Sequence, residues 1–130
     1  MKNGAETILS CGRTVYVPAG ARDAAELPWN AHPAFAGVAL KHLVCGADTD
    51  GAISCHLVRV EPGMSLRSHV HDGQWELHEV VAGSGEAGVG EARVAYLPGV
   101  SAVIPKGVVH EVTAGDEGLT LFAKFFPALL

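Results

Sequence analysis

The stretch that decides how this chain folds is GMSLRSHVHDGQWELHEVVAG, residues 63–83. Alternate side chains of a β-strand lie on one face, so His69 and His71, two residues apart, are expected to share a face. An Asp-Gly turn follows, and an antiparallel hairpin closed there would place His71 opposite Glu76 and His69 opposite His78. The local sequence therefore predicts a patch of three histidines and one carboxylate.

A patch of this composition can be an ordinary solvated polar face or a metal site. Imidazole and carboxylate groups that face inward without partners cost free energy to bury. A metal ion offsets that cost, because neutral imidazole and carboxylate are ligands of first-row transition ions. We therefore expect one divalent ion, Fe, Mn, Ni, Zn or Cu, among which the ligand types alone do not select.

The rest of the chain is punctuated by sixteen glycines and seven prolines, which are spread along it and not gathered into a linker. Short apolar runs separated by turn residues every eight to twelve positions are typical of an all-β sandwich or barrel. No strand–helix alternation is visible, which disfavours a parallel α/β sheet. The predicted strands are 38–44, 53–60, 65–71, 76–82, 92–97, 101–105, 108–114 and 119–126, with GSGEAG at 83–88 expected to close the fourth of them.

The N-terminal part is less regular. Residues 7–17 are expected to form one or two short strands, and the Pro- and Ala-rich segment 18–37 an extended arm or loop, because its prolines forbid a long helix. Trp29 and Phe35 are the expected anchors of this arm to the body of the protein.

Composition limits the class of protein. The chain has 130 residues, 48% of them hydrophobic, and a formal net charge of −5, which fits one domain with its own core. Its nine basic residues are scattered, so no nucleic-acid partner is expected. No apolar run suggests a signal peptide or a membrane span, so a soluble, cytoplasmic protein is expected. Cys11, Cys45 and Cys55 are expected to be buried free thiols.

Two spaced motifs carry a family resemblance. The first is Gly63-x5-His69-x-His71-x4-Glu76-x6-Gly83, and the second is Gly99-x5-Pro105-x-Gly107-x2-His110. At this spacing the sequence resembles the cupin superfamily, in particular its small single-domain members. Ala114 stands where the second motif usually closes with Asn, at a position that is structural in the family.

The resemblance implies a double-stranded β-helix, the jelly-roll or cupin barrel, with the metal ion held by His69, His71, Glu76 and His110. It also implies that residues 1–37 form a strand and arm packed on the barrel, and residues 38–126 the barrel itself, with motifs at 63–83 and 99–114. Many cupins pair through their last strand and an N-terminal arm, so we expect a homodimer.

Other residues are second-tier candidates. His78 is absent from the family pattern, and we expect it to act as a general acid or base, as a partner that orients a ligand, or as a fifth ligand. His32, His42 and His56 are isolated, and a lone histidine is more often structural than a ligand. Periodicity leaves open whether His56 or Arg59 faces the cavity, and an inward Arg59 would suit an anionic substrate.

Three classes of function follow. The expected one is a small-molecule metalloenzyme of dioxygenase, isomerase or lyase type, because a site of three His and one Glu leaves coordination positions for substrate. The alternative is a non-catalytic cupin that binds a sugar or an effector. A metal-free sugar-nucleotide epimerase is disfavoured, because basic residues for the phosphates are too few.

Overall fold

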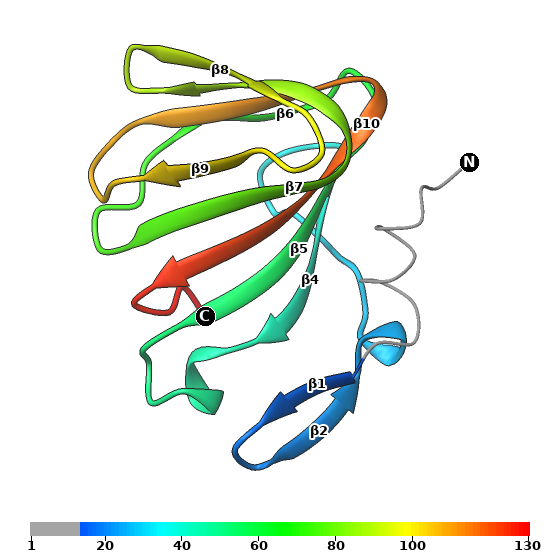
Figure 1. Ribbon diagram of the computed structural model, residues 1–130, viewed down its shortest axis with the longest axis vertical. Helices are drawn as coiled ribbons and strands as arrows, with labels where there is room; N and C mark the ends of the chain where they lie inside the picture. The colour runs from blue at the N-terminus through cyan, green and yellow to red at the C-terminus, as the bar shows by residue number, and fades with distance from the viewer. Residues whose placement is uncertain (1–13) are drawn as a thin grey trace.

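The chain folds almost entirely into antiparallel strands, and the computed structural model describes residues 14–130 (Figure 1). Two 3₁₀ helices, η1 (Ala24–Glu26) and η2 (Gly46–Asp48), interrupt them. The strands are β1 (Thr14–Val17), β2 (Gly20–Asp23), β3 (Asn30–Ala31), β4 (Val38–Val44), β5 (Ser54–Val60), β6 (Ser65–His69), β7 (Trp75–Val89), β8 (Ala92–Tyr96), β9 (Ser101–Ile104) and β10 (His110–Phe126).

Strands β3 to β10 form one continuous hydrogen-bonded ladder that folds over into the two facing sheets of the barrel. The two long strands, β7 and β10, pair with each other along most of their length and contribute to both of these sheets. The N-terminal half of β7 pairs with β9, and its C-terminal half pairs with β8. Likewise, the N-terminal half of β10 pairs with β6 and its C-terminal half with β5, which continues to β4 and β3. The result is a jelly-roll double-stranded β-helix, as predicted, with the core between the two sheets.

Glycines let these two strands bend without ending. Gly83 and Gly118 both have positive φ, and the register of β7 against β10 shifts between Ala114 and Leu119. A Cβ on Gly83 would overlap the carbonyl oxygen of Gly118, so the backbones approach too closely for a side chain. The predicted turn at 83–88 was wrong for this reason: its glycines bend a strand that continues to Val89.

The predicted hairpin between the third and fourth strands was also wrong. β6 does not pair with β7; it pairs with β10, where His69 lies opposite His110. The chain between β6 and β7 crosses from one sheet to the other, and β7 takes β9 and β10 as neighbours. A pairing rule that uses only local sequence cannot anticipate a partner about 40 residues away in the chain.

The N-terminal segment is more structured than an arm. β1 and β2 form a hairpin, and Arg22 of this hairpin makes a bidentate ion pair with Asp48 at the end of η2. The two predicted anchors are confirmed: Trp29 packs near Leu57, and Phe35 packs against the main core.

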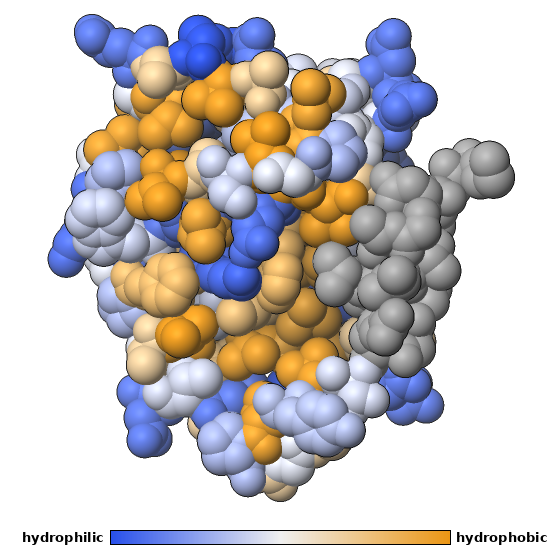
Figure 2. Space-filling view, viewed as in Figure 1, coloured by the Kyte–Doolittle hydropathy of each residue, from blue (hydrophilic) through white to orange (hydrophobic). Residues whose placement is uncertain are grey.

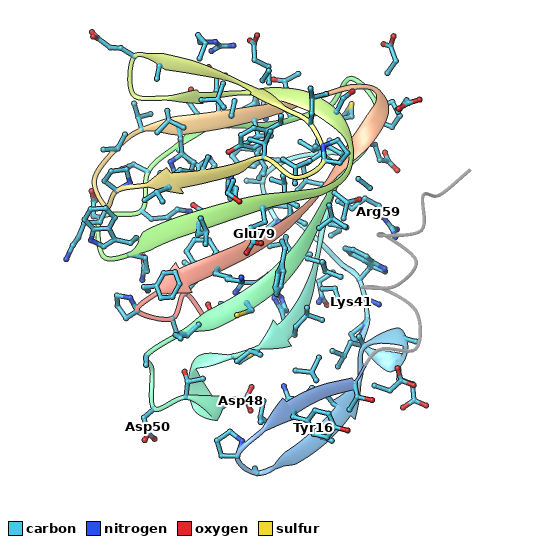
Figure 3. The ribbon with its side chains drawn as sticks, in the orientation of Figure 1. Tyr16, Lys41, Asp48, Asp50, Arg59 and Glu79 are labelled. Atoms are coloured by element: carbon cyan, nitrogen blue, oxygen red, sulfur yellow. The ribbon has the colours of Figure 1, made fainter. Side chains whose placement is uncertain are left out.

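Parity along β5 settles which of its faces looks inward. His56 is fully buried and Val58 belongs to the main core, whereas the guanidinium of Arg59 lies over the Trp29 ring, 4.0 Å from its centroid. Figure 3 shows Arg59 on the side of the sheet where the N-terminal segment lies. Arg59 therefore does not supply a positive charge to the interior.

The remaining expectations are met in part. Cys45 and Cys55 are free thiols but only partly buried. Cys11 and residues 7–13 of the first predicted strand lie outside the described residues. In residues 14–130, no helix has the length and apolar character that crossing a membrane requires.

Candidate metal centre

Three histidines from different parts of the fold meet inside the barrel. His69 ends β6, His71 follows it, and His110 begins β10 directly opposite His69. One ring nitrogen from each of the three lies within 4.8 Å of the other two, a spacing at which they could hold one metal ion. The cross-strand register, not a local hairpin, brings the second motif to the first.

Backbone hydrogen bonds fix which nitrogen each ring presents. Nδ1–H of His69 donates to the carbonyl oxygen of Arg67 (2.7 Å), and Nδ1–H of His110 donates to that of Val108 (3.0 Å). In the neutral form of both rings, which is the form that binds a metal ion, Nε2 is then unprotonated and carries a lone pair. Such outer hydrogen bonds orient metal-binding histidines in known sites.

Glu76, from the start of β7, lies beside the three histidines. Its Oε1 lies 3.1 Å from Nε2 of His110 and 3.8 Å from Nε2 of His71. Both Oε1 of Glu76 and Nε2 of His110 are buried without an aligned hydrogen-bond partner among the described residues. Buried polar atoms are almost always paired, so this orphaned pair indicates a place where a ligand belongs.

The charge state of the cluster suits a cation. Burial alone would raise the pKa of Glu76, but the imidazoles of His110 and His78 outweigh it and hold that pKa well below its usual range. Burial lowers the pKa of His69 and of His71, which keeps their rings neutral. Burial also opposes protonation of His110, yet the Glu76 carboxylate raises the pKa of that ring. A buried carboxylate is costly unless a positive charge compensates it.

A second layer holds the carboxylate in place. Nε2–H of His78 donates to Oε2 of Glu76 (2.6 Å), and the hydroxyl of Tyr96 lies 2.8 Å from Nδ1 of His78, to which it can donate. Tyr96 is fully buried at the end of β8, and His78 is 2% exposed. Only Oε1 of Glu76 is left to face the three histidines.

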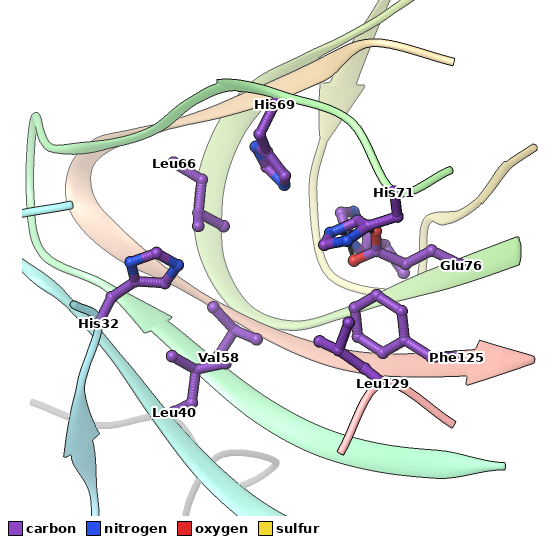
Figure 4. Close-up of a pocket in the computed structure, with 10 residues that line it drawn as sticks. His32, Leu40, Val58, Leu66, His69, His71, Glu76, Phe125 and Leu129 are labelled. Carbon is purple, nitrogen blue, oxygen red and sulfur yellow. Dashed lines mark hydrogen bonds and ion pairs between the residues drawn. The ribbon is translucent and has the colours of Figure 1, made fainter. Parts of the chain in front are cut away.

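A small cavity opens beside this cluster, with a volume of about 70 Å³ (Figure 4). One side is polar and is formed by His69, His71, Glu76 and His78, and His32 from the N-terminal segment also reaches it. The other walls are apolar and are formed by Leu40, Val58, Leu66, Phe125 and Leu129.

The sequence pointed to His69, His71, Glu76, His78 and His110, which the structure brings together, and gave no indication of several residues that surround them. Strand periodicity did not distinguish Tyr96 from its neighbours. The property that could have identified it is that a buried tyrosine needs a hydrogen-bond partner for its hydroxyl group. Leu129 was missed because the last residues fold back on the barrel, with the backbone N–H of Leu129 donating to Oγ of Ser54. His32 was treated as isolated because its partners come from the three-dimensional fold.

Comparison with solved structures finds the same fold. One is KdgF from Halomonas sp., with 19% identity over 79% of this chain and 88% of that one, and a TM-score of 0.69. Another is a predicted oxalate decarboxylase from Thermotoga maritima, with 21% identity over 79% and 95% and a TM-score of 0.70. A third is an RmlC-like cupin from Shewanella frigidimarina, with 18% identity over 83% and 90% and a TM-score of 0.72. Identities this low establish the fold and leave the activity open.

Comparison with curated proteins gives no match. The family model described as "Cupin domain" matches residues 56–123, which include the histidines and the glutamate of the cluster. That match spans just over half of the chain, and the jelly-roll topology agrees with it. The chain therefore belongs to the cupin domain family.

Proposed function

We propose that this protein is a metal-dependent enzyme of small-molecule chemistry, of the dioxygenase, isomerase or lyase type. Its one divalent first-row transition ion would be held by His69, His71, Glu76 and His110. The observation that carries the proposal is the convergence of one ring nitrogen from each of three histidines within 4.8 Å of one another. Beside them lies a buried Oε1 of Glu76, 3.1 Å from Nε2 of His110 and 3.8 Å from Nε2 of His71, that has no aligned hydrogen-bond partner among the described residues.

The donor set fits the proposed ion. Three imidazole nitrogens and one carboxylate oxygen suit Fe, Mn, Ni, Zn or Cu, and a bound divalent ion would act as a Lewis acid that polarises an oxygen of the substrate. His69 and His110 present Nε2 because backbone carbonyls accept from their Nδ1–H groups. Glu76 supplies one negative charge, which leaves a divalent site with a net charge of +1.

His78 has a positioning role in this proposal. Both of its ring nitrogens are engaged, one by Tyr96 and one by Glu76, so it fits the predicted role of a partner that orients a ligand better than that of a fifth ligand. Because Oε2 of Glu76 accepts from His78, the carboxylate offers one oxygen to the ion. This leaves more room at the metal for a substrate that binds through two atoms.

The cavity favours a small substrate. Its volume of about 70 Å³ is far below the several hundred Å³ typical of pockets for drug-sized ligands. A sugar nucleotide or an oligosaccharide would not fit inside it. The alternative, a cupin that binds a small effector without chemistry, uses the same cavity and differs only in the absence of turnover.

Metal content tests the proposal. Metal-free protein is reconstituted with Fe, Mn, Ni, Zn and Cu in turn, and bound metal is measured per chain for the wild type and for the His69→Ala/His71→Ala double variant. We expect one ion per wild-type chain and none in the double variant. Glu76→Gln should bind metal more weakly, while Glu86→Gln, whose side chain lies on the surface in an ion pair with Arg93, should match the wild type. Absence of metal uptake by the wild-type protein under every condition would refute the proposal.

Assembly and location complete the proposal. A homodimer agrees with the apolar side chains that are scattered over the face shown in Figure 2. It also agrees with the exposure of Trp75 on β7, Val103 on β9 and Phe126 on β10, which are 45%, 60% and 38% exposed. Light scattering on the purified protein would test it, with twice the chain mass expected. A cytoplasmic location is proposed from the sequence alone and is testable by cell fractionation.

A further inference from the structure

His32 belongs to the cavity although it comes from the N-terminal segment. It follows β3, and its backbone N–H donates to the carbonyl oxygen of Val38 at the start of β4 (2.8 Å). Its ring stacks on Phe35 (centroids 4.6 Å apart, planes at 17°), and Phe35 in turn contacts His69, with centroids 5.8 Å apart. The imidazole is thus held against the cluster from outside the two motifs.

The hydrogen bonds of this ring fix its tautomer. The backbone N–H groups of Ala34 and Phe35 both donate to Nδ1 of His32, at 3.0 and 3.2 Å. Nδ1 is therefore an acceptor, and the hydrogen of the neutral ring resides on Nε2. Burial lowers the pKa of His32, which favours this neutral form at physiological pH. His32 would therefore contact a ligand by donating a hydrogen bond from its Nε2–H group.

The cavity has polar side chains at both ends, His71 and Glu76 at one and His32 at the other, and apolar walls between them. Figure 4 shows the His32 ring projecting into the cavity across from His71 and Glu76, with Leu40, Val58 and Leu66 nearer to His32 and with Phe125 and Leu129 nearer to Glu76. None of the described residues that line it is a lysine or an arginine.

We propose that His32 contacts the ligand, and that the cavity takes a short-chain oxygenated compound with at most one negative charge. The ligand would offer oxygen atoms to the metal at one end, an apolar middle to the leucine and valine walls, and a hydrogen-bond acceptor to Nε2–H of His32 at the other end. This inference rests on the proposed function, because one end of the cavity is the proposed metal site.

Charge sets the limit on the ligand. A divalent ion with the Glu76 carboxylate has a net charge of +1, which one carboxylate or enolate of the ligand would neutralise. A second negative charge at the far end would meet Leu40, Val58, Leu66 and the neutral His32, and burying a charge without a partner is costly. Dianions should therefore bind poorly.

Three matched 2-oxo acids test the proposal on the cobalt(II)-loaded protein, whose visible absorption changes when a ligand enters the metal's coordination shell. The first, 2-oxohexanoate, has an apolar end. In the second, 4-methoxy-2-oxobutanoate, an ether oxygen replaces one methylene. The third, 2-oxoadipate, has a second carboxylate. We expect the methoxy acid to bind about threefold to tenfold more tightly than 2-oxohexanoate, the value of one hydrogen bond, and 2-oxoadipate to bind most weakly.

Variants of His32 identify the contact. His32→Phe keeps an aromatic ring to stack on Phe35 but has no donor, and it should abolish the preference for the methoxy acid while leaving 2-oxohexanoate affinity within about twofold. His32→Gln retains an N–H donor and should keep part of the preference. Three results, each obtained with normal cobalt binding, would overturn this inference and leave the proposed function standing. They are an unchanged preference for the methoxy acid in His32→Phe, binding of 2-oxoadipate as tight as that of the methoxy acid, and no spectral response to any of the three acids. Failure to bind cobalt would overturn this inference, and failure to take up Fe, Mn, Ni, Zn and Cu as well would overturn both.

Discussion

Glu76 is held by a chain of hydrogen bonds that runs from Tyr96 through His78 to Oε2 of the carboxylate. The cupin pattern quoted from the sequence does not include His78. Its inward position was predicted from a hairpin pairing with His69 that does not form, and what holds is that His78 and Glu76 share one face of β7 and are both buried. Tyr96 could not be predicted, because its partner is on another strand. Together the two residues decide that Glu76 presents a single oxygen to the histidines.

Removing the hydroxyl group of Tyr96 tests this series of hydrogen bonds. Tyr96→Phe leaves Nδ1 of the buried His78 without its partner, so the free energy of unfolding should fall by about 1 kcal/mol. The affinity for metal, measured by competition with a chelator, should fall about 10-fold or more, because such outer partners orient the ligands. Tyr16→Phe is the matched control, since Tyr16 is 82% exposed, and it should change neither quantity. Unchanged metal affinity in Tyr96→Phe would show that Glu76 is held by other means.

The buried His56, which lies outside the candidate metal centre, predicts how the stability of the protein depends on pH. Burial, and to a smaller extent His42, lower the pKa of His56 from 6.5 to about 4, although Glu76 acts in the opposite direction. Nε2 of His56 bonds with Ser54, and its Nδ1 lies 2.8 Å from Nδ1 of His42. Between these two pKa values the unfolded chain binds more protons than the folded one, so acidification favours unfolding.

The expected result is a loss of stability as the pH falls from about 6.5 towards 4, in which His56 accounts for about 1–2 kcal/mol after allowance for solvent screening. Urea denaturation of metal-free protein at several pH values measures it, with His56→Gln as the comparison. The variant should be less stable near neutral pH and should lose less on acidification. An equal loss in both proteins would show that protonation of His56 does not contribute.

At the scale of the strands, the bend shared by β7 and β10 shapes the barrel. Each strand contributes its two halves to different sheets, and this turns Glu76 and His78 on one half of β7 towards His110 on β10. Gly83 sits at the bend with φ of +79°, against the backbone of Gly118. An L-residue there would meet both an unfavourable φ and a steric clash.

Gly83→Ala should therefore destabilise the protein by about 2 kcal/mol or more, since the added methyl group must displace backbone and not a flexible side chain. Thermal or urea unfolding measures the effect. Gly73→Ala is the matched control: no atom lies within 4 Å of the position its Cβ would take, and it should change stability by less than about 0.5 kcal/mol. Equal stability of the two variants would contradict this account of the bend.

The same strands show what sequence patterns could and could not predict. Alternation correctly placed His69 with His71 and Glu76 with His78, because side-chain parity is a local property of a strand. Pairing is not local: β6 joins β10, and the four-residue hairpin that would have joined it to β7 does not form. Thus the predicted residues come together, but through the register of His69 against His110.

At the scale of the molecule, the cavity is enclosed by distant parts of the chain. The two motifs supply the polar cluster, the segment before β4 supplies His32, and the residues after β10 supply Leu129. The motif spacing could predict the cluster because those residues follow a family pattern. The apolar walls follow no such pattern, since many small hydrophobic residues satisfy the same packing.

The central claim is that one metal ion is bound by His69, His71, Glu76 and His110, and anomalous X-ray diffraction from crystals of the metal-reconstituted protein tests it most directly. We predict one strong anomalous peak per chain, about 2.0–2.2 Å from Nε2 of His69, from Nε2 of His110, from a ring nitrogen of His71 and from Oε1 of Glu76. The other oxygen, Oε2, should remain bonded to His78. A fully loaded crystal with no peak at this position, or with the metal bound elsewhere, would contradict the account.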